Sequence, residues 1–192
     1  MIIMINGAFG SGKTSAAKAL QPRIENSMIY DPEEIGYMIR KLLPEEHREE
    51  QERTDDFQDI ELWKVLTVNA AREVKQKYNK HLIVPMTLYK KANFDYIYSG
   101  LKKFDPDLHH FCLTAELETI YKRLAKRGDE FGGWQYQQAP KCVEAFKADV
   151  FETRIATDHL ATDEVIDIIL QKVKGKTKRR QYEKRHTISN SK

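Results

Sequence analysis

The phosphate-loop pattern G-x-x-x-x-G-K-[ST] constrains this chain more than any other feature, and each of its fixed positions is met. Its residues are Gly7, Ala8, Phe9, Gly10, Ser11, Gly12, Lys13 and Thr14. The apolar run at residues 1–5 before it is long enough for one buried strand and too short to span a membrane. In such a loop the glycines admit a phosphate close to the backbone, Lys13 reaches the β- and γ-phosphates, and Thr14 offers a hydroxyl to Mg²⁺. The pattern therefore predicts a nucleoside triphosphate site between a strand and a helix at residues 12–20.

Length and composition predict one domain and exclude several classes of protein. A chain of 192 residues with 41% hydrophobic content supports one sizeable core. Cys112 and Cys142 lie far apart and lack metal-ligand spacing, so we expect reduced, packed thiols and neither a disulfide framework nor a zinc site. No segment has the pattern of a signal peptide or a membrane span. Together these features predict a cytoplasmic protein.

The formal net charge is +3, but the charged residues are unevenly distributed along the chain. Lys and Arg gather at residues 172–192, where Glu183 is the one acid, and acids outnumber bases in the rest of the chain. We therefore expect one nucleotide-binding phosphate-loop domain at residues 1–174 and a basic tail at 175–192. The acidic domain argues against nucleic-acid binding. The tail is either a solubilising end or a weak contact with the anionic surface of a membrane, which would make the protein peripheral to it.

Apolar runs and helical periodicity alternate along the chain. Strands are expected at residues 1–5, 27–30, 81–84, 108–113 and 153–157, and helices at 12–20, 32–43, 57–78, 92–104, from a cap at Thr114 to 124, and from 162 to 173. The acidic segment 45–56 has no apolar residue and is expected to be a solvated excursion outside the core. Repeated strand–helix alternation predicts a three-layer α/β fold, with a five-stranded parallel sheet covered by helices on both faces. Ligands of such sheets gather beyond the carboxyl ends of the strands.

Asp31 follows the second strand and has two interpretations that do not exclude each other. Pro32 and Glu34 behind it indicate an N-cap, which contributes about 1 kcal/mol. At the same edge of the sheet its carboxylate could instead hold Mg²⁺ together with Thr14, or accept a proton from a substrate hydroxyl. The third strand ends in Thr87 where many phosphate-loop enzymes carry an acid. Residues 79–82 lack the aspartate of a guanine-reading N-K-x-D motif, so ATP is favoured over GTP.

Two arginines precede a glycine-rich segment after the fourth strand. Arg123 and Arg127 lie four residues apart on one helix, and residues 128–134 contain three glycines before Trp134. This pattern favours a lid that closes over a transferring phosphoryl group, with Trp134 stacking on a ring of the substrate. The alternative is a solvated helix face. Arg40 on the second helix either contacts an acceptor or faces water.

Several segments resemble the family of bacterial tunicamycin resistance proteins. They are MIIMINGAFGSGKT at the start, Asp31-Pro32-Glu33 with Gly36 and Arg40, DDFQDIELW at 55–63, LIVPMT at 82–87 and TDHL at 157–160. The resemblance implies a fold similar to nucleoside monophosphate kinases, strand order 2-3-1-4-5, and ATP at residues 7–14. It also implies a role in resistance to a nucleoside antibiotic that mimics a UDP-sugar. Membrane association in that family is attributed to an amphipathic C-terminal segment, and the tail here is more basic and less apolar.

Three functions are consistent with these patterns. The first is an ATP- and Mg²⁺-dependent phosphotransferase for a small molecule. In it Lys13 holds ATP, Thr14 and Asp31 hold Mg²⁺, Asp31 orients the acceptor, and Arg123 and Arg127 close over the γ-phosphate. Arg40, Thr87 and Trp134 are candidate substrate contacts, with Asp31. The second function is an ATP-gated protein that sequesters the antibiotic without chemistry, and the third is a nucleotide kinase with another substrate.

Overall fold

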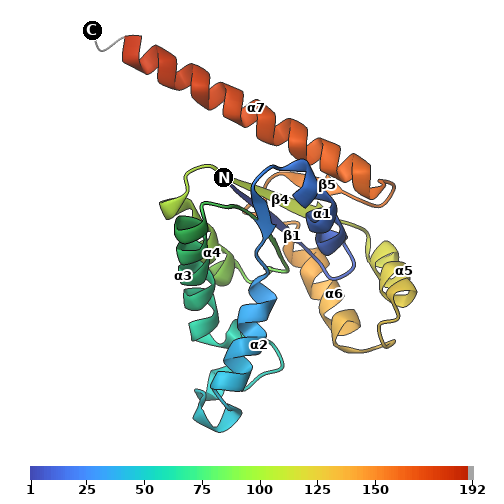
Figure 1. The fold of residues 1–192 in the computed structure, drawn as a ribbon. Coiled ribbons are helices and arrows are strands. Elements are labelled where there is room, and N and C mark those ends of the chain that lie inside the picture. The colour runs from blue at the N-terminus through green and yellow to red at the C-terminus, as the bar shows by residue number, and fades with distance from the viewer. Residues whose placement is uncertain (190–192) are drawn as a thin grey trace.

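A parallel five-stranded sheet forms the centre of the computed structural model, which describes residues 1–189, with side chains described up to residue 175. Its strands are β1 (Ile2–Gly7), β2 (Ser27–Ile29), β3 (His81–Met86), β4 (Leu108–Thr114) and β5 (Arg154–Ala156). Their order is β2-β3-β1-β4-β5, and every neighbouring pair is parallel. The predicted fold class and strand order are therefore confirmed (Figure 1).

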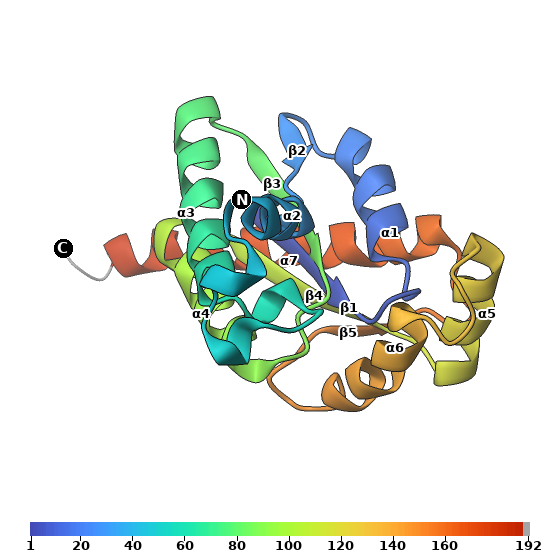
Figure 2. The ribbon, with the colours of Figure 1, turned by 90° about the horizontal axis from the view of Figure 1, so that it is seen from below.

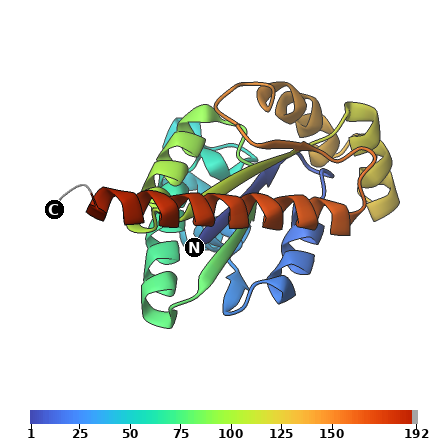
Figure 3. The same ribbon diagram turned by 90° about the horizontal axis from the view of Figure 1, so that it is seen from above.

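Helices cover both faces of this sheet (Figures 1 and 3). They are α1 (Lys13–Leu20), α2 (Pro32–Leu42), α3 (Glu61–Tyr78), α4 (Lys91–Phe104), α5 (Leu117–Arg127), α6 (Trp134–Ala145) and α7 (Thr162–Ser189). Side chains alternate along β1, so that Ile3 and Ile5 pack with α1 and α7 whereas Ile2 and Met4 face the core shared with α2, α3 and α4. Because both faces of β1 are buried, residues 2–5 of the strand are all apolar, as is typical of parallel central strands.

The structure adds a helix that the sequence analysis did not predict. Helix α6 follows two glycines and contains Pro140, and both are typical helix breakers. Its buried positions, Tyr136, Ala139 and Cys142, recur at helical spacing among polar neighbours. The expected cap at Thr114 is wrong, because β4 extends through that residue and Glu116 stands at the N-cap of α5.

Residues 45–56 are less solvated than their composition predicts. They form two 3₁₀ turns at Glu45–His47 and Glu50–Glu52, and two of their charged side chains are buried. The buried Arg48 donates through Nε to the carbonyl of Leu43 at 2.9 Å, at the end of α2. Buried Glu52 accepts from the backbone N–H of Glu61 at 2.8 Å, at the start of α3. The two charged side chains satisfy backbone groups that the ends of helices leave unpaired. The expectation of a fully solvated segment is therefore wrong for Arg48 and Glu52.

Helix α7 continues past residue 174, where the domain boundary was expected, and runs to Ser189 (Figure 3). The side chains of the basic tail beyond residue 175 lie outside the described part of the chain, and with them the predicted contact with a membrane surface. Within the described residues, no helix is long and apolar enough to cross a membrane.

Candidate functional site

The phosphate loop occupies the turn between β1 and α1, and Gly7 is the position that its shape most depends on. Gly7 has φ +151°, and a Cβ there would lie 2.4 Å from the carbonyl oxygen of Leu113 and 2.6 Å from Oγ of Ser11. Gly12 at the N-cap of α1 is in the left-handed region, and no side chain caps that helix. The first turn of α1 therefore presents N–H groups and the positive end of the helix dipole to the loop.

Asn6, which the sequence analysis did not select, holds the start of this loop. It is fully buried, and its Oδ1 accepts from the backbone N–H groups of Gly7 at 2.9 Å and Leu88 at 2.8 Å. Its Nδ2 donates to the carbonyl of Leu88 at 3.1 Å. Since Leu88 follows β3, this one side chain joins the ends of two neighbouring strands beneath the site.

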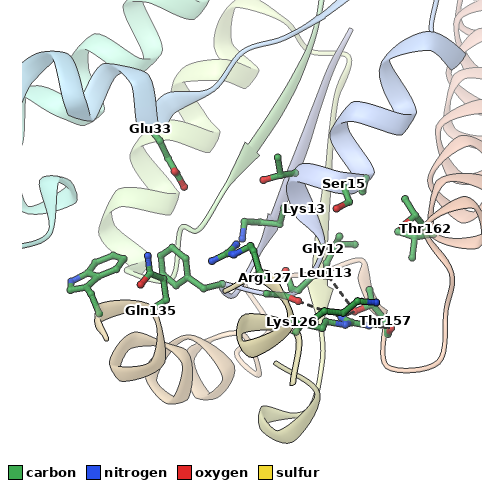
Figure 4. Close-up of a pocket in the computed structure, with 18 of the residues that line it drawn as sticks. Gly12, Lys13, Ser15, Glu33, Leu113, Lys126, Arg127, Gln135, Thr157 and Thr162 are labelled. Atoms are coloured by element: carbon green, nitrogen blue, oxygen red, sulfur yellow. Dashed lines mark hydrogen bonds between the residues drawn. The ribbon is translucent and has the colours of Figure 1, made fainter. Parts of the chain in front are cut away.

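Lys13 points into the cleft at the centre of the site (Figure 4). Its side chain is buried, and Nζ donates to the carbonyl of Ala8 at 2.8 Å. Burial lowers the pKa of Lys13 to about 8, with the nearby carboxylate of Glu33 acting in the opposite direction. A phosphate would supply the counter-charge that favours the ammonium form.

ATP affinity should accordingly fall in alkaline solution. Between pH 7 and pH 9 the free protein loses most of the charge on Lys13, so binding must add a proton to the side chain, and we expect affinity for ATP to drop about tenfold. Isothermal titration calorimetry at pH 7, 8 and 9 measures this. A constant affinity over that range would show that Lys13 keeps its charge without a ligand.

A cleft of about 1080 Å³ opens in front of the phosphate loop. Seen from below, the loop lies between α2 on one side and α5 and α6 on the other (Figure 2). We call one part of the cleft the α2 end, which is lined by Glu33, Tyr37, Arg40, Asp55, Phe57 and Gln58. The opposite part, the α7 end, is lined by Thr157, Leu160, Ala161, Thr162 and Val165. Residues 9–14, Arg40, Arg123, Arg127 and Trp134 line the cleft as predicted contacts should, whereas Gly7, Ala8, Asp31 and Thr87 are not part of its lining.

Asp31 caps α2, as its capping interpretation predicts. Its Oδ1 accepts from the backbone N–H of Glu33 at 3.0 Å. The roles predicted for Asp31 in catalysis and in holding Mg²⁺ stay predictions. Of the two acids Asp31 and Glu33, Glu33 is the one that lines the cleft. The sequence signal for Glu33 was obscured because acids in the first turn of a helix commonly serve only its dipole.

Glu33 faces Lys13 and Arg127 across the cleft, and the three side chains come from α2, α1 and α5 (Figure 4). Burial raises the pKa of Glu33, and the nearby carboxylate of Asp31 adds to the effect, whereas Lys13 and Arg127 oppose it. A carboxylate with a raised pKa beside two cations is suited to accept a proton from a hydroxyl group.

The two arginines of α5 have different partners. Arg123 donates through Nη1 to the hydroxyl of Thr157 at 2.9 Å and through Nη2 to the carbonyl of the same residue, and its Nη1 also lies 3.5 Å from the carbonyl of Gly10. It thereby joins the phosphate loop to the loop after β5. Arg127 makes a bidentate pair with Asp129 at 2.6 and 2.7 Å, which raises the pKa of Arg127. Arg127 is thus held beside the cleft by a carboxylate that a phosphate could replace.

Thr87 is buried behind the cleft wall. Its carbonyl accepts from Nε2 of Gln58 at 2.8 Å, and Gln58, a residue that the sequence analysis missed, lines the cleft. Within the described part of the chain, the Thr87 hydroxyl has no hydrogen-bond partner. The signal for Gln58 was present in the DDFQ segment, but the sequence could not indicate which residue of that segment faces inward.

Arg40 and Trp134 both border the cleft and both contact aromatic rings. Arg40 donates to the carbonyl of Asp55, and its guanidinium lies 5.7 Å from the centre of the Phe57 ring. Trp134 meets Phe9 of the phosphate loop edge-on, with 5.0 Å between ring centres. The first residue of α6 therefore packs directly on the nucleotide loop.

The residues fit a magnesium ion held chiefly by a bound triphosphate. Thr14 is exposed at the start of α1 and lines the cleft, so its hydroxyl can serve as one ligand. Among the described residues there is no group of three His, Cys, Asp or Glu side chains that could hold a metal by themselves. Mg²⁺ in phosphate-transfer sites commonly takes one or two protein ligands plus phosphate and water oxygens.

Comparison with known proteins identifies the family of this chain. The family model described as an AAA domain matches residues 3–139. The structure of a tunicamycin resistance protein from Deinococcus radiodurans is 31% identical, with a TM-score of 0.73, 90% of this chain and 94% of that chain covered. No curated protein matches the sequence.

Two kinases of lower identity share the fold. A gluconokinase from Sinorhizobium meliloti 1021 has 17% identity and a TM-score of 0.66, with 94% of this chain and 95% of that chain covered. A shikimate kinase from Acinetobacter baumannii, solved with shikimate, has 17% identity and a TM-score of 0.60, with 91% and 93% covered. The P-loop kinase-like fold binds ATP with Mg²⁺ in general. With its phosphate loop, its strand order and the likeness to the Deinococcus protein over nearly its whole length, the chain belongs to the tunicamycin resistance protein family, within the P-loop kinase-like AAA domains.

Proposed function

We propose that this protein transfers the γ-phosphoryl group of ATP to a hydroxyl group of a small molecule, with a nucleoside antibiotic such as tunicamycin as the first candidate. The observation that carries the proposal is the meeting of Glu33, Lys13 and Arg127 in one cleft beside the phosphate loop (Figure 4). A base, a phosphate-binding cation and a lid cation within one cleft are the groups that phosphoryl transfer requires.

In this mechanism ATP lies along the phosphate loop with its adenine ring at the α7 end of the cleft. The acceptor enters from the α2 end. Glu33 takes the proton of the acceptor hydroxyl as that oxygen bonds to the γ-phosphorus and the bond to the β-phosphate oxygen breaks, so ADP leaves. Lys13 and Arg127 stabilise the charge on the phosphoryl oxygens. Arg123 holds the loop after β5 against the phosphate loop through its hydrogen bonds to both. Mg²⁺, held by the Thr14 hydroxyl and the phosphates, would neutralise part of the triphosphate charge.

The proposal is tested by incubating tunicamycin with the protein, Mg²⁺ and ATP. The expected product is heavier by about 80 Da, the mass of one transferred phosphoryl group, and mass spectrometry detects it. A reaction with ADP in place of ATP is the control and should give no product. An unchanged antibiotic mass, together with tight binding in calorimetry, would contradict phosphoryl transfer.

That last outcome would support the second candidate, an ATP-dependent protein that sequesters the drug. One observation favours it: β3 is followed by the buried Thr87, where other phosphate-loop enzymes place an acid near the metal. In this case antibiotic affinity should rise when ATP is bound, and no phosphorylated product should form.

A further inference from the structure

Charge is segregated along the cleft. Among the described residues, four cationic side chains of the lining lie at the phosphate loop and on α5: Lys13, Arg123, Lys126 and Arg127. The two carboxylates of the lining, Glu33 and Asp55, both belong to the α2 end. A triphosphate and an acceptor placed in this cleft would therefore meet fields of opposite sign.

Arg40, which lines the α2 end, already has partners in the protein. One arm of its guanidinium donates to the backbone carbonyl of Asp55, and the group lies against the face of Phe57. The side-chain carboxylates of Glu33 and Asp55, within the described part of the chain, take part in no hydrogen bond or ion pair. Arginine binds phosphate and carboxylate groups best when its fork is available for bidentate contact, and one arm of the Arg40 fork is used by the backbone.

The α2 end also carries aromatic surface. Tyr37 on α2 is 48% exposed, and its ring stands edge-on to Phe57 with 6.0 Å between the centres. An exposed aromatic ring at the mouth of a binding cleft suits stacking on a flat heterocycle.

We propose that Asp55, together with Glu33, makes this site specific for uncharged hydroxyl-bearing ring compounds, of the chemical class of nucleosides, and excludes their phosphorylated counterparts. This inference rests on the proposed function of the cleft. An acceptor with a phosphate at the α2 end would bring two further negative charges beside two unpaired carboxylates. At surface-like screening that repulsion corresponds to about 30-fold in affinity.

The test compares adenosine, cytidine, guanosine and uridine with their four 5′-monophosphates. Each compound is titrated calorimetrically into protein saturated with Mg²⁺ and ADP, so that the nucleotide site is filled. We expect the best-bound nucleoside to bind about 30-fold more tightly than its own monophosphate. A monophosphate that binds as tightly as its nucleoside, or a panel in which no nucleoside binds, would overturn the inference.

Charge reversal assigns the effect to one side chain. Asp55→Lys should bring a nucleoside and its monophosphate to about equal affinity. Asp55→Asn should reduce the ratio of nucleoside affinity to monophosphate affinity by about threefold. Glu46→Lys is the matched control, because Glu46 is exposed in the same excursion, lies outside the cleft lining and changes net charge equally. If Asp55→Lys keeps its wild-type far-UV spectrum and the wild-type ratio, Asp55 does not determine specificity.

The same eight compounds, incubated with the protein, Mg²⁺ and ATP in place of ADP, separate this inference from the proposed function. Nucleosides that bind with the expected preference but are never phosphorylated would contradict the function and leave the selectivity intact. Monophosphates that are converted to diphosphates faster than nucleosides are phosphorylated would support phosphoryl transfer and contradict the selectivity.

Discussion

A Lys13→Ala variant is expected to bind ATP about 100-fold or more weakly than the wild type, with any turnover reduced at least as much. Lys13 is the buried cation of the phosphate loop, and its Nζ already lies at hydrogen-bonding distance from the loop carbonyl of Ala8. Truncating one partner of a buried, hydrogen-bonded charge pair costs about 2–5 kcal/mol of binding free energy, which is about 30-fold to several thousand-fold in affinity. Calorimetry with ATP and Mg²⁺ measures the loss.

Lys18→Ala provides the matched control on the same helix. Lys18 is exposed in the last turn of α1 and lies outside the cleft lining, so its loss should change ATP affinity by less than about twofold. A thermal melt of both variants shows whether the fold is retained. Undiminished ATP affinity in a folded Lys13→Ala protein would contradict the assignment of this loop to the nucleotide.

The second large effect is expected at Glu33. Glu33→Gln keeps the size of the side chain and removes its ability to take a proton, so turnover should fall about 100- to 10,000-fold, the contribution of a general base. ATP affinity should stay within about threefold, because the phosphate loop and Lys13 are unchanged. The ratio of phosphorylated to unmodified antibiotic, followed over time by mass spectrometry, measures the rate.

Asp31→Asn tests Asp31, the carboxylate that the sequence analysis predicted as the proton acceptor. Asparagine caps helices nearly as well as aspartate, so stability should change by less than about 1 kcal/mol. Because Asp31 lies outside the cleft lining, turnover should stay within about tenfold of the wild type. The reverse pattern, with Asp31→Asn inactive and Glu33→Gln active, would return the role of base to Asp31.

The sequence alone determined the phosphate loop of this protein. Residues 7–14 are contiguous, and the geometry of a phosphate loop depends on local requirements: glycines where the backbone turns, and a lysine at the start of the helix. The alternation of apolar strands and amphipathic helices determined the fold class for a similar reason, because each element reveals its buried positions by its own periodicity. Helix α6 was missed because its glycines and Pro140 hide that periodicity.

Only the tertiary structure decided how the α2 end of the cleft is built. Asp31 and Glu33 stand two residues apart at the start of α2, and which of them faces the cleft depends on how α2 lies against the sheet. The segment 55–58 reaches the cleft because Gln58 bonds to the carbonyl of Thr87, and because Lys90 pairs with Asp56 at 2.9 Å. These partners are about 30 residues apart in the chain. No local pattern specifies such contacts, since they form only when the packing of the sheet and its helices brings distant segments together.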